Sequence, residues 1–253
     1  MVDKIEYHIH GDDLQMVEIM LDPGEGVRAE TGTMTFMENG IEMETSTGGG
    51  FLTGLKRAFA GESFFITTFL NRARQKASVA FAAPYPGKII PIDLTAEGGT
   101  FICQRDAYLC SAQGIEVSIA FSKRLGAGLF GGEGFVLEKL EGNGMAFIHA
   151  GGTIVEKHLA PAQTLQVDTG CIVGFSESMD YDIQMVKGFK NMLFGGEGLF
   201  LATLRGPGKV YLQSLPLSRL ADRILAATHR QTGEKRGVDG LGGDLLGSLL
   251  SGS

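Results

Sequence analysis

The chain has 253 residues, of which 43% are apolar, 20% are charged and 38 are glycine. This composition excludes a chain that is disordered throughout, because so many apolar residues can build a sizeable core. The net charge of −7 disfavours nucleic acid as a partner, since the average field of the protein repels phosphates. The three scattered cysteines are typical of a reducing compartment rather than of a disulfide framework.

The sequence also predicts a cytoplasmic protein without a transmembrane segment. The longest stretch without a charged residue, Gly142 to Val155, is shorter than the ~20 residues that a membrane-spanning helix needs. Residues 1–15 carry charges and lack the apolar centre of a signal peptide.

Short strands joined by tight turns are predicted along most of the chain. Apolar and polar residues alternate, as in half-buried strands, in the segments 41–44, 90–94, 116–121 and 181–185. Residues 216–229 are predicted to form one amphipathic helix, with an apolar stripe that includes Leu217 and Ile224. The glycine-rich residues 230–253 are expected to form a flexible tail.

Much of the glycine belongs to a segment that recurs three times. Its copies contain the turn residues Gly61 and Glu62, Gly132 and Glu133, and Gly196 and Glu197. The glutamates are 71 and then 64 residues apart, and a phenylalanine precedes each copy. Such glycines supply a positive φ or room for a neighbouring backbone, so we interpret these residues as the defining turn of a repeat.

Two further blocks repeat in the same order. Glu30, Gln104 and Asp168 mark one block, at spacings of 74 and 64 residues. The segments 41–44, 115–118 and 181–184 mark the other, at spacings of 74 and 66 residues. Three independent blocks predict one body over 1–229, with β repeats at about 12–86, 87–151 and 152–215 and the helix at its end.

A repeat of this length cannot cover both faces of its own sheet, so the repeats must bury those faces against one another. The sequence therefore predicts an all-β fold of three tandem sandwich-like or barrel-like repeats around a pseudo-threefold axis, plus one C-terminal amphipathic helix.

The Gly-Gly-Glu-Gly-type blocks, the Leu-x-Gly-x-Gly turns at 140–144 and 204–208, and the Leu-Pro-Leu-Ser-Arg-Leu-Ala stretch at 215–221 carry a resemblance. Together they resemble the altered-inheritance-of-mitochondria family of prokaryotic proteins, which has a eukaryotic relative in mitochondrial biogenesis. The resemblance covers about residues 12–228 and implies a fold similar to that of the tryptophan RNA-binding attenuator protein. It implies no catalytic residues. Neither tryptophan nor RNA binding is expected, because this chain is acidic and has no evident Lys/Arg register.

Two sets of residues are candidate metal ligands. Glu62, Glu133 and Glu197 are weak candidates for a cation site if they converge on the pseudo-axis. The alternative, favoured by their repetition, is that each makes the same local turn contact in its own repeat. His8 and His10 place two imidazoles on one face of an extended segment, but no third ligand is suggested by the spacing. We therefore expect no metal and no other cofactor.

Methionines are concentrated in the first repeat. Five of them lie at positions 16, 20, 34, 37 and 43. They could form an adaptable binding face, but methionine is also a common filler of irregular cores, so we expect them in the core.

No arrangement of nucleophile, base and acid is evident, so the sequence predicts that the protein is not an enzyme. The leading hypothesis is a β scaffold or binding protein that forms a homo-oligomer, because exposed sheet edges must be paired or covered. One alternative is a small-molecule-binding or metal-binding protein with a pocket between repeats. Another is peripheral membrane association through the leucine-rich residues 233–253.

Overall fold

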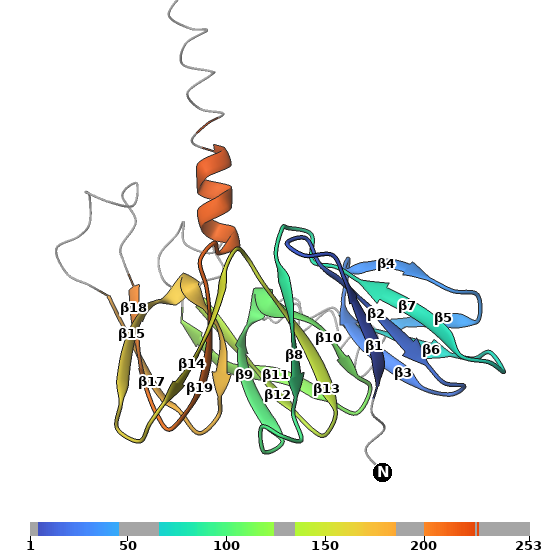
Figure 1. Cartoon of the computed structure of the whole chain (residues 1–253), viewed down its shortest axis with the longest axis horizontal. Coiled ribbons are helices and arrows are strands. Elements are labelled where there is room, and N and C mark those ends of the chain that lie inside the picture. Colours follow the sequence, from blue (N-terminus) through green and yellow to red (C-terminus); the bar gives the residue numbers. More distant parts are fainter. Residues whose placement is uncertain (1–4, 46–65, 124–134, 186–199, 226, 228–253) are drawn as a thin grey trace, which may run out of the picture. The chain divides into compact units, whose positions relative to one another are not determined.

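A computed structural model describes residues 5–45, 66–123, 135–185, 200–225 and 227. These residues contain nineteen strands in four antiparallel sheets and one short helix near the C-terminal end (Figure 1). The predicted β structure with a C-terminal helix is confirmed. The chain divides into two compact units, Met1–Pro216 and Leu217–Ser253, and each is described by itself.

All four sheets belong to the first unit, and each consists of the following strands in spatial order. Sheet 1 contains β1 (Glu6–His10), β2 (Met16–Leu21), β7 (Ala77–Phe81) and β4 (Met34–Met37). Sheet 2 contains β5 (Ile41–Thr45), β6 (Ile66–Asn71), β3 (Gly26–Glu30), β10 (Tyr108–Ala112), β13 (Met145–Ala150) and β8 (Lys88–Asp93). Sheet 3 contains β11 (Glu116–Lys123), β12 (Phe135–Glu141), β9 (Thr100–Gln104), β16 (Ile172–Ser176), β19 (Gly208–Gln213) and β14 (Ile154–Leu159). Sheet 4 contains β15 (Thr164–Asp168), β18 (Phe200–Arg205) and β17 (Asp180–Met185). The short 3-10 helices η1 (Arg105–Ala107) and η2 (Thr169–Cys171) connect β9 to β10 and β15 to β16.

One pairing pattern runs through three consecutive sets of six strands, β2–β7, β8–β13 and β14–β19. In each set the sixth strand lies between the first and the third, and the fifth lies between the second and the fourth. The pairs β3–β10 and β9–β16 join successive sets edge to edge. Each six-stranded sheet therefore contains strands from two successive sets.

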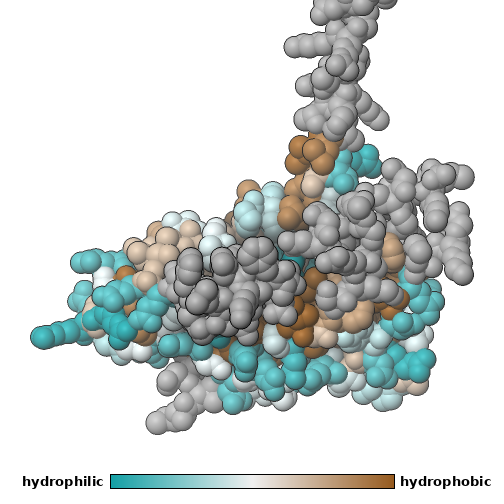
Figure 2. All heavy atoms as spheres, turned by 180° about the vertical axis from the view of Figure 1, so that it is seen from behind, coloured by the Kyte–Doolittle hydropathy of each residue, from teal (hydrophilic) through white to brown (hydrophobic). Residues whose placement is uncertain are grey.

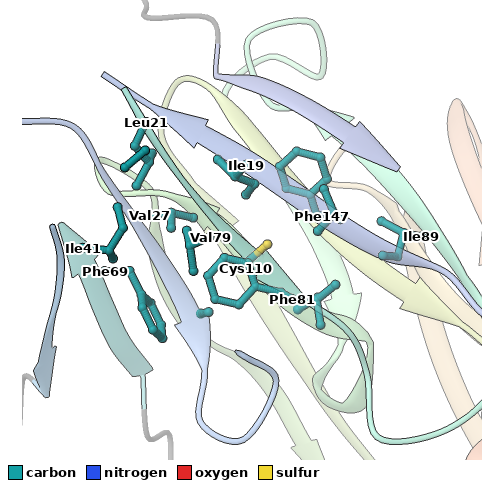
Figure 3. Close-up of a cluster of buried hydrophobic side chains, with 14 residues drawn as sticks. Ile19, Leu21, Val27, Ile41, Phe69, Val79, Phe81, Ile89, Cys110 and Phe147 are labelled. Carbon is teal, nitrogen blue, oxygen red and sulfur yellow. The ribbon is translucent and has the colours of Figure 1, made fainter. Parts of the chain in front are cut away.

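Three hydrophobic cores lie between successive sheets. Core 1, between sheets 1 and 2, contains Ile19, Leu21, Val79 and Phe81 on one side and Val27, Phe69 and Phe147 on the other (Figure 3). Core 2, between sheets 2 and 3, contains Ile92 and Ile148 together with Phe101, Leu140 and Val173. Core 3, between sheets 3 and 4, contains Leu137, Phe175 and Val210 together with Ile183 and Leu204. The four sheets therefore form one stack.

Strands in the middle of the stack are buried on both faces, because adjacent residues point into different cores. Phe147 belongs to core 1 and the next residue, Ile148, to core 2. Likewise, Ile102 belongs to core 3 and Cys103 to core 2. A strand with two buried faces needs apolar residues at nearly every position, which explains the continuous burial along β9 and β13.

The third strand of each set carries the same irregularity against the sixth. The pairing register shifts between Met34 and Phe36 in β4, between Tyr108 and Cys110 in β10, and between Ile172 and Gly174 in β16. Such a shift marks one extra residue in the bulged strand. The residues that follow the bulge are therefore equivalent on β4, β10 and β16, and they define matched positions on the three strands.

One strand departs from its predicted alternation. The sequence placed Val117, Ile119 and Phe121 of β11 on one face, but the register shifts between Ile119 and Phe121. A bulge interrupts the two-residue period of a strand, and Ile119 is 38% exposed.

The second unit begins with a helix over residues 217–225, directly after Pro216. Proline suits this boundary because it lacks the N–H that the start of a helix leaves unpaired. The predicted helix extended to residue 229, and residues 226 and 228–229 lie outside the described part. Leu217, Ile224 and Leu225 are 38%, 56% and 56% exposed, and Figure 2 shows apolar and hydrophilic residues gathered on different sides of the helix. In the described part of the chain, no helix is long and apolar enough to cross a membrane.

Candidate functional site

The edge strands of the four sheets differ in whether they contain residues that disfavour pairing with a further strand. Natural edges are commonly blunted by charged residues or proline. Six of the eight described edge strands follow this rule: β1 has Glu6, β5 has Glu42 and Glu44, β8 has Lys88 and Pro91, β11 has Glu116, β14 has Glu156 and Lys157, and β17 has Asp180 and Asp182. The two exceptions are β4 and β15.

Strand β4 is the one described edge strand without a charged residue or a proline. It pairs with β7 on one side, and its other side has no strand partner among the described residues. Phe36 and Met37 on this strand are 38% and 40% exposed. At the end of the stack that carries sheet 1, Figure 2 also shows apolar residues at the surface. An exposed apolar edge of this kind is a template for another strand.

The matched positions on β10 and β16 have a different environment. The register shifts match Phe36 with Cys110 and Gly174, and Met37 with Ser111 and Phe175. The four residues on β10 and β16 are all buried, because β3 and β9 pair with these strands. Of the three matched strands, only β4 lacks such a neighbour among the described residues.

Strand β15 is the second exception, because its single charged residue is its last. The Asp168 carboxylate accepts a hydrogen bond from the Gly170 amide at 3.0 Å and caps η2. Strand β15 pairs with β18, and nothing described pairs with its other side. Leu165 and Val167 contribute to core 3, whereas Thr164 and Gln166 are exposed.

Glu30, Gln104 and Asp168, which the sequence aligned as one repeated block, occupy equivalent places in the strand pairing. These residues lie opposite Ile66, Leu137 and Leu201, the first, third and second residues of β6, β12 and β18. Their predecessors Ala29, Cys103 and Val167 lie opposite Thr67, Glu138 and Ala202. The same two positions are therefore matched on β3, β9 and β15.

A second unusual feature is a buried carboxylate on β12, in the middle of the stack. Glu138 has no exposed surface, and neither of its carboxylate oxygens has a hydrogen-bond partner within the described structure. Burial, reinforced by the nearby negative charge of Glu30, raises its pKa well above the usual range, although Arg105 partly offsets this. Glu138 is therefore held in its neutral form.

Glu30 lies at the end of β3 near the same charges. The Glu30 residue is exposed at the surface, but the protein on one side of its carboxylate still desolvates that group. Desolvation and the negative charge of Asp106 raise the pKa of Glu30 to about 7, against the opposing effect of Arg105. The Tyr85 hydroxyl donates a hydrogen bond to the Asp106 backbone carbonyl at 3.0 Å, which ties the loop before β8 to η1.

His149 on β13 is a third buried ionisable group. It is 2% exposed, and its ring meets that of Tyr85 edge to face with centroids 4.6 Å apart. Its Nδ1 has no partner among the described atoms, and burial lowers its pKa to about 4. The ring is therefore neutral at physiological pH.

The predicted metal candidates fall into two groups. Glu62, Glu133 and Glu197, with their turn glycines Gly61, Gly132 and Gly196, lie outside the described residues. The rings of His8 and His10 lie 4.4 Å apart on β1, and His10 Nε2 is 2.8 Å from Glu18 Oε2. Over the described ranges, no group of three or more His, Cys, Asp or Glu residues is placed to hold a metal ion.

The methionines of the first repeat are less buried than predicted. Met37 and Met43 are 40% and 48% exposed, and Met16, Met20 and Met34 are only partly buried. The expectation that these residues fill the core is wrong for Met37 and Met43, because both lie on edge strands, β4 and β5.

Sequence reasoning missed both unprotected edges and the buried Glu138. The absence of charge from residues 34–37 was a visible signal for β4, but its edge position depends on long-range pairing. Glu138 had no comparable signal, because a glutamate followed by Lys139 in a strand is usually a solvent-facing residue.

These features define a predominantly β protein of stacked antiparallel sheets, with two unprotected edges. Residues 7–215 match the family described as mitochondrial biogenesis AIM24, and the chain belongs to this family, as the sequence predicted. An uncharacterised protein of Streptococcus pyogenes serotype M6 is 31% identical over 218 residues, which are 83% of this chain and 85% of that protein. A crystal structure of a protein from Streptococcus pyogenes matches with a TM-score of 0.72 at 26% identity, covering 88% of this chain and 100% of that one.

Proposed function

We propose that this protein is a non-enzymatic β scaffold that self-associates into a homo-oligomer through its unprotected sheet edges. The observation that carries the proposal is the open side of β4, where Phe36 and Met37 are exposed on a strand without charge or proline. Burying such residues against another chain removes apolar surface from water and pairs the free backbone groups of the edge.

The scaffold consists of three copies of one six-stranded unit, with boundaries near residues 86 and 151. Three observations support this organisation. The pairing order recurs in β2–β7, β8–β13 and β14–β19, and the third strand of each set has the same register shift. The second strands β3, β9 and β15 also pair with the fifth strands at matched positions. A ring closed within one chain would need β4 to pair with β15, and these strands lie in different sheets. A pseudo-threefold axis through the three units stays a prediction.

Light scattering on the full chain at micromolar concentrations tests self-association. We expect a mass above the 27.0 kDa of a single chain. Met37→Lys places a charge on the open edge and is expected to lower that mass. Met43→Lys is the matched control, because Met43 is a similarly exposed methionine on β5, an edge that already carries Glu42 and Glu44. A natural chain with the mass of one copy at these concentrations would contradict the proposal.

A further inference from the structure

Two junctions inside the chain have the same geometry, and they supply a template for a third. At the β10–β3 junction, Cys110 pairs with Ala29 and Ser111 with Arg28. At the β16–β9 junction, Gly174 pairs with Cys103 and Phe175 with Ile102. In both cases the third strand of one set pairs antiparallel with the second strand of the preceding set, in one register.

In the described chain, one more third strand and one more second strand occur, and neither has a strand partner on its outer side. Strand β4 is the third strand of the first set, and the described residues contain no set before it. Strand β15 is the second strand of the third set, and the part of the chain that the structure describes contains no set after it. These two strands lie in sheets 1 and 4, at opposite ends of the stack of the first unit (Figure 1).

We propose that β4 of one copy pairs antiparallel with β15 of the next copy, in the register of the two internal junctions. This inference rests on the proposed self-association and names its partner and its geometry. The matched positions place Phe36 opposite Val167 of the next copy, and Met37 opposite Gln166 of the next copy.

The side chains on the two edges fit this pairing. Phe36 occupies the position of Cys110 and Gly174, which are buried at the internal junctions and face Ala29 and Cys103. Its new neighbour, Val167, is 8% exposed and part of core 3. The ring of Phe36 would therefore leave water to lie against an apolar residue, as its counterparts do within the chain.

The remaining described edges do not offer the same match. A pairing of β4 with β4 of another copy would be symmetric, and neither internal junction joins two third strands. The other six edges, β1, β5, β8, β11, β14 and β17, carry charged residues within or at the ends of their strands. Continuity with the internal junctions therefore selects β15.

Head-to-tail pairing makes the interface heterologous, because each copy contributes β4 on one side and β15 on the other. Sheet 4 of one copy and sheet 1 of the next become one continuous sheet, as in sheets 2 and 3. Interfaces of this type generate rings where the rotation closes and filaments where it does not.

Disulfide crosslinking between two variants, each with one added cysteine, tests the register. The residues at positions 37 and 166 are both exposed, so Met37→Cys and Gln166→Cys leave the cores intact. Directly paired antiparallel residues have Cα atoms about 4.5–5.5 Å apart, within the range that a disulfide spans. Mild oxidation of a mixture of the two variants is expected to give a covalent dimer, and each variant alone is expected to give no more than the natural chain. Cys103 and Cys110 are buried and Cys171 is partly buried, so the natural chain measures the background.

Thr164→Cys provides the matched register control, because Thr164 is an exposed residue of β15 two positions from Gln166. That displacement of about 6.6 Å along the strand removes position 164 from disulfide reach of position 37. Its mixture with Met37→Cys is expected to crosslink at least several-fold less.

The outcomes separate this inference from the proposed function. Covalent dimers from Met37→Cys alone would indicate symmetric β4–β4 pairing and overturn the inference. An oligomer that gives no crosslink between positions 37 and 166, or an equal one between 37 and 164, overturns the register while self-association stands. A natural chain that is monomeric overturns both.

Discussion

Glu138 on β12 lies directly opposite Cys103 on β9, and both residues are completely buried in the middle of the stack. Burial is the largest cause that raises the pKa of both the Cys103 thiol and the Glu138 carboxyl, and it favours the neutral form of each side chain. A neutral carboxyl without a hydrogen-bond partner still carries a desolvation penalty of about 1–3 kcal/mol. This pair is therefore a point where the core is less stable than an apolar core would be.

Replacing Glu138 by an apolar residue of similar size is expected to stabilise the protein. Glu138→Met removes the unpartnered carboxyl, and we expect the free energy of unfolding at pH 7 to rise by about 1–3 kcal/mol in urea titrations. Because the folded-state pKa of Glu138 is raised, the stability of the natural chain is greatest below the unfolded pKa near 4.5 and falls as the pH rises above it. The variant should lack this part of the pH dependence. Glu116→Met, at an exposed position of β11, is the control and should change little; a lower stability of Glu138→Met would contradict the prediction.

Glu30→Gln is expected to flatten stability over a defined pH range. The natural carboxyl has a pKa of about 7 in the folded protein and 4.5 as its reference value. A raised folded pKa means that stability is greatest below about 4.5 and falls as the pH rises towards 7. Urea unfolding measured between pH 4.5 and 8 should show a smaller decline in Glu30→Gln than in the natural chain. An unchanged profile would show that the neighbourhood of Glu30 and Asp106 does not hold the carboxyl neutral.

Equivalent residues of the repeated blocks occupy matched places in the strand pairing, whereas the sequence did not identify the unpaired edges, for a physical reason. The spacing of Glu30, Gln104 and Asp168 reflects local strand and turn lengths, so it matches the register seen between β3 and β6 and their counterparts. Which strands remain unpaired depends on contacts between sets, and no local pattern distinguishes Met37 from the buried Phe175. Burial on both faces also depends on the neighbouring sheets, which is why Glu138 looked like a solvated residue.

Asn71→Ala is expected to destabilise the first set of strands. Asn71 is fully buried, and its side-chain amide donates to the backbone carbonyls of Leu21 and Gln75 at 2.8 and 2.9 Å. Its side-chain carbonyl accepts from the Ala73 amide at 2.9 Å. Truncation leaves these backbone groups without their partner, so we expect a loss of at least about 2 kcal/mol in urea unfolding.

Asn143→Ala is the control for this change, because Asn143 is an exposed turn residue. Surface substitutions of this kind usually lie within about 0.5 kcal/mol of the natural chain. Equal stabilities of the two variants would show that water replaces the hydrogen bonds of Asn71.

Gly174→Ala tests how closely the strands approach at an internal junction. Gly174 lies opposite Cys103, and a Cβ added to it would stand 2.5 Å from Phe101 Cε1 and 2.8 Å from the Ile102 carbonyl oxygen. Both distances are below van der Waals contact, and the carbonyl belongs to the backbone of β9, so β9 and β16 must move apart. We expect a loss of about 1–3 kcal/mol in the free energy of unfolding, typical of overpacking in a core. Gly114→Ala is the matched control, because no described atom lies within 4 Å of the place its methyl group would take and its backbone φ is not positive. If both variants were equally stable, the junction would be looser than its geometry indicates, and its use as a template for pairing between copies would lose its basis.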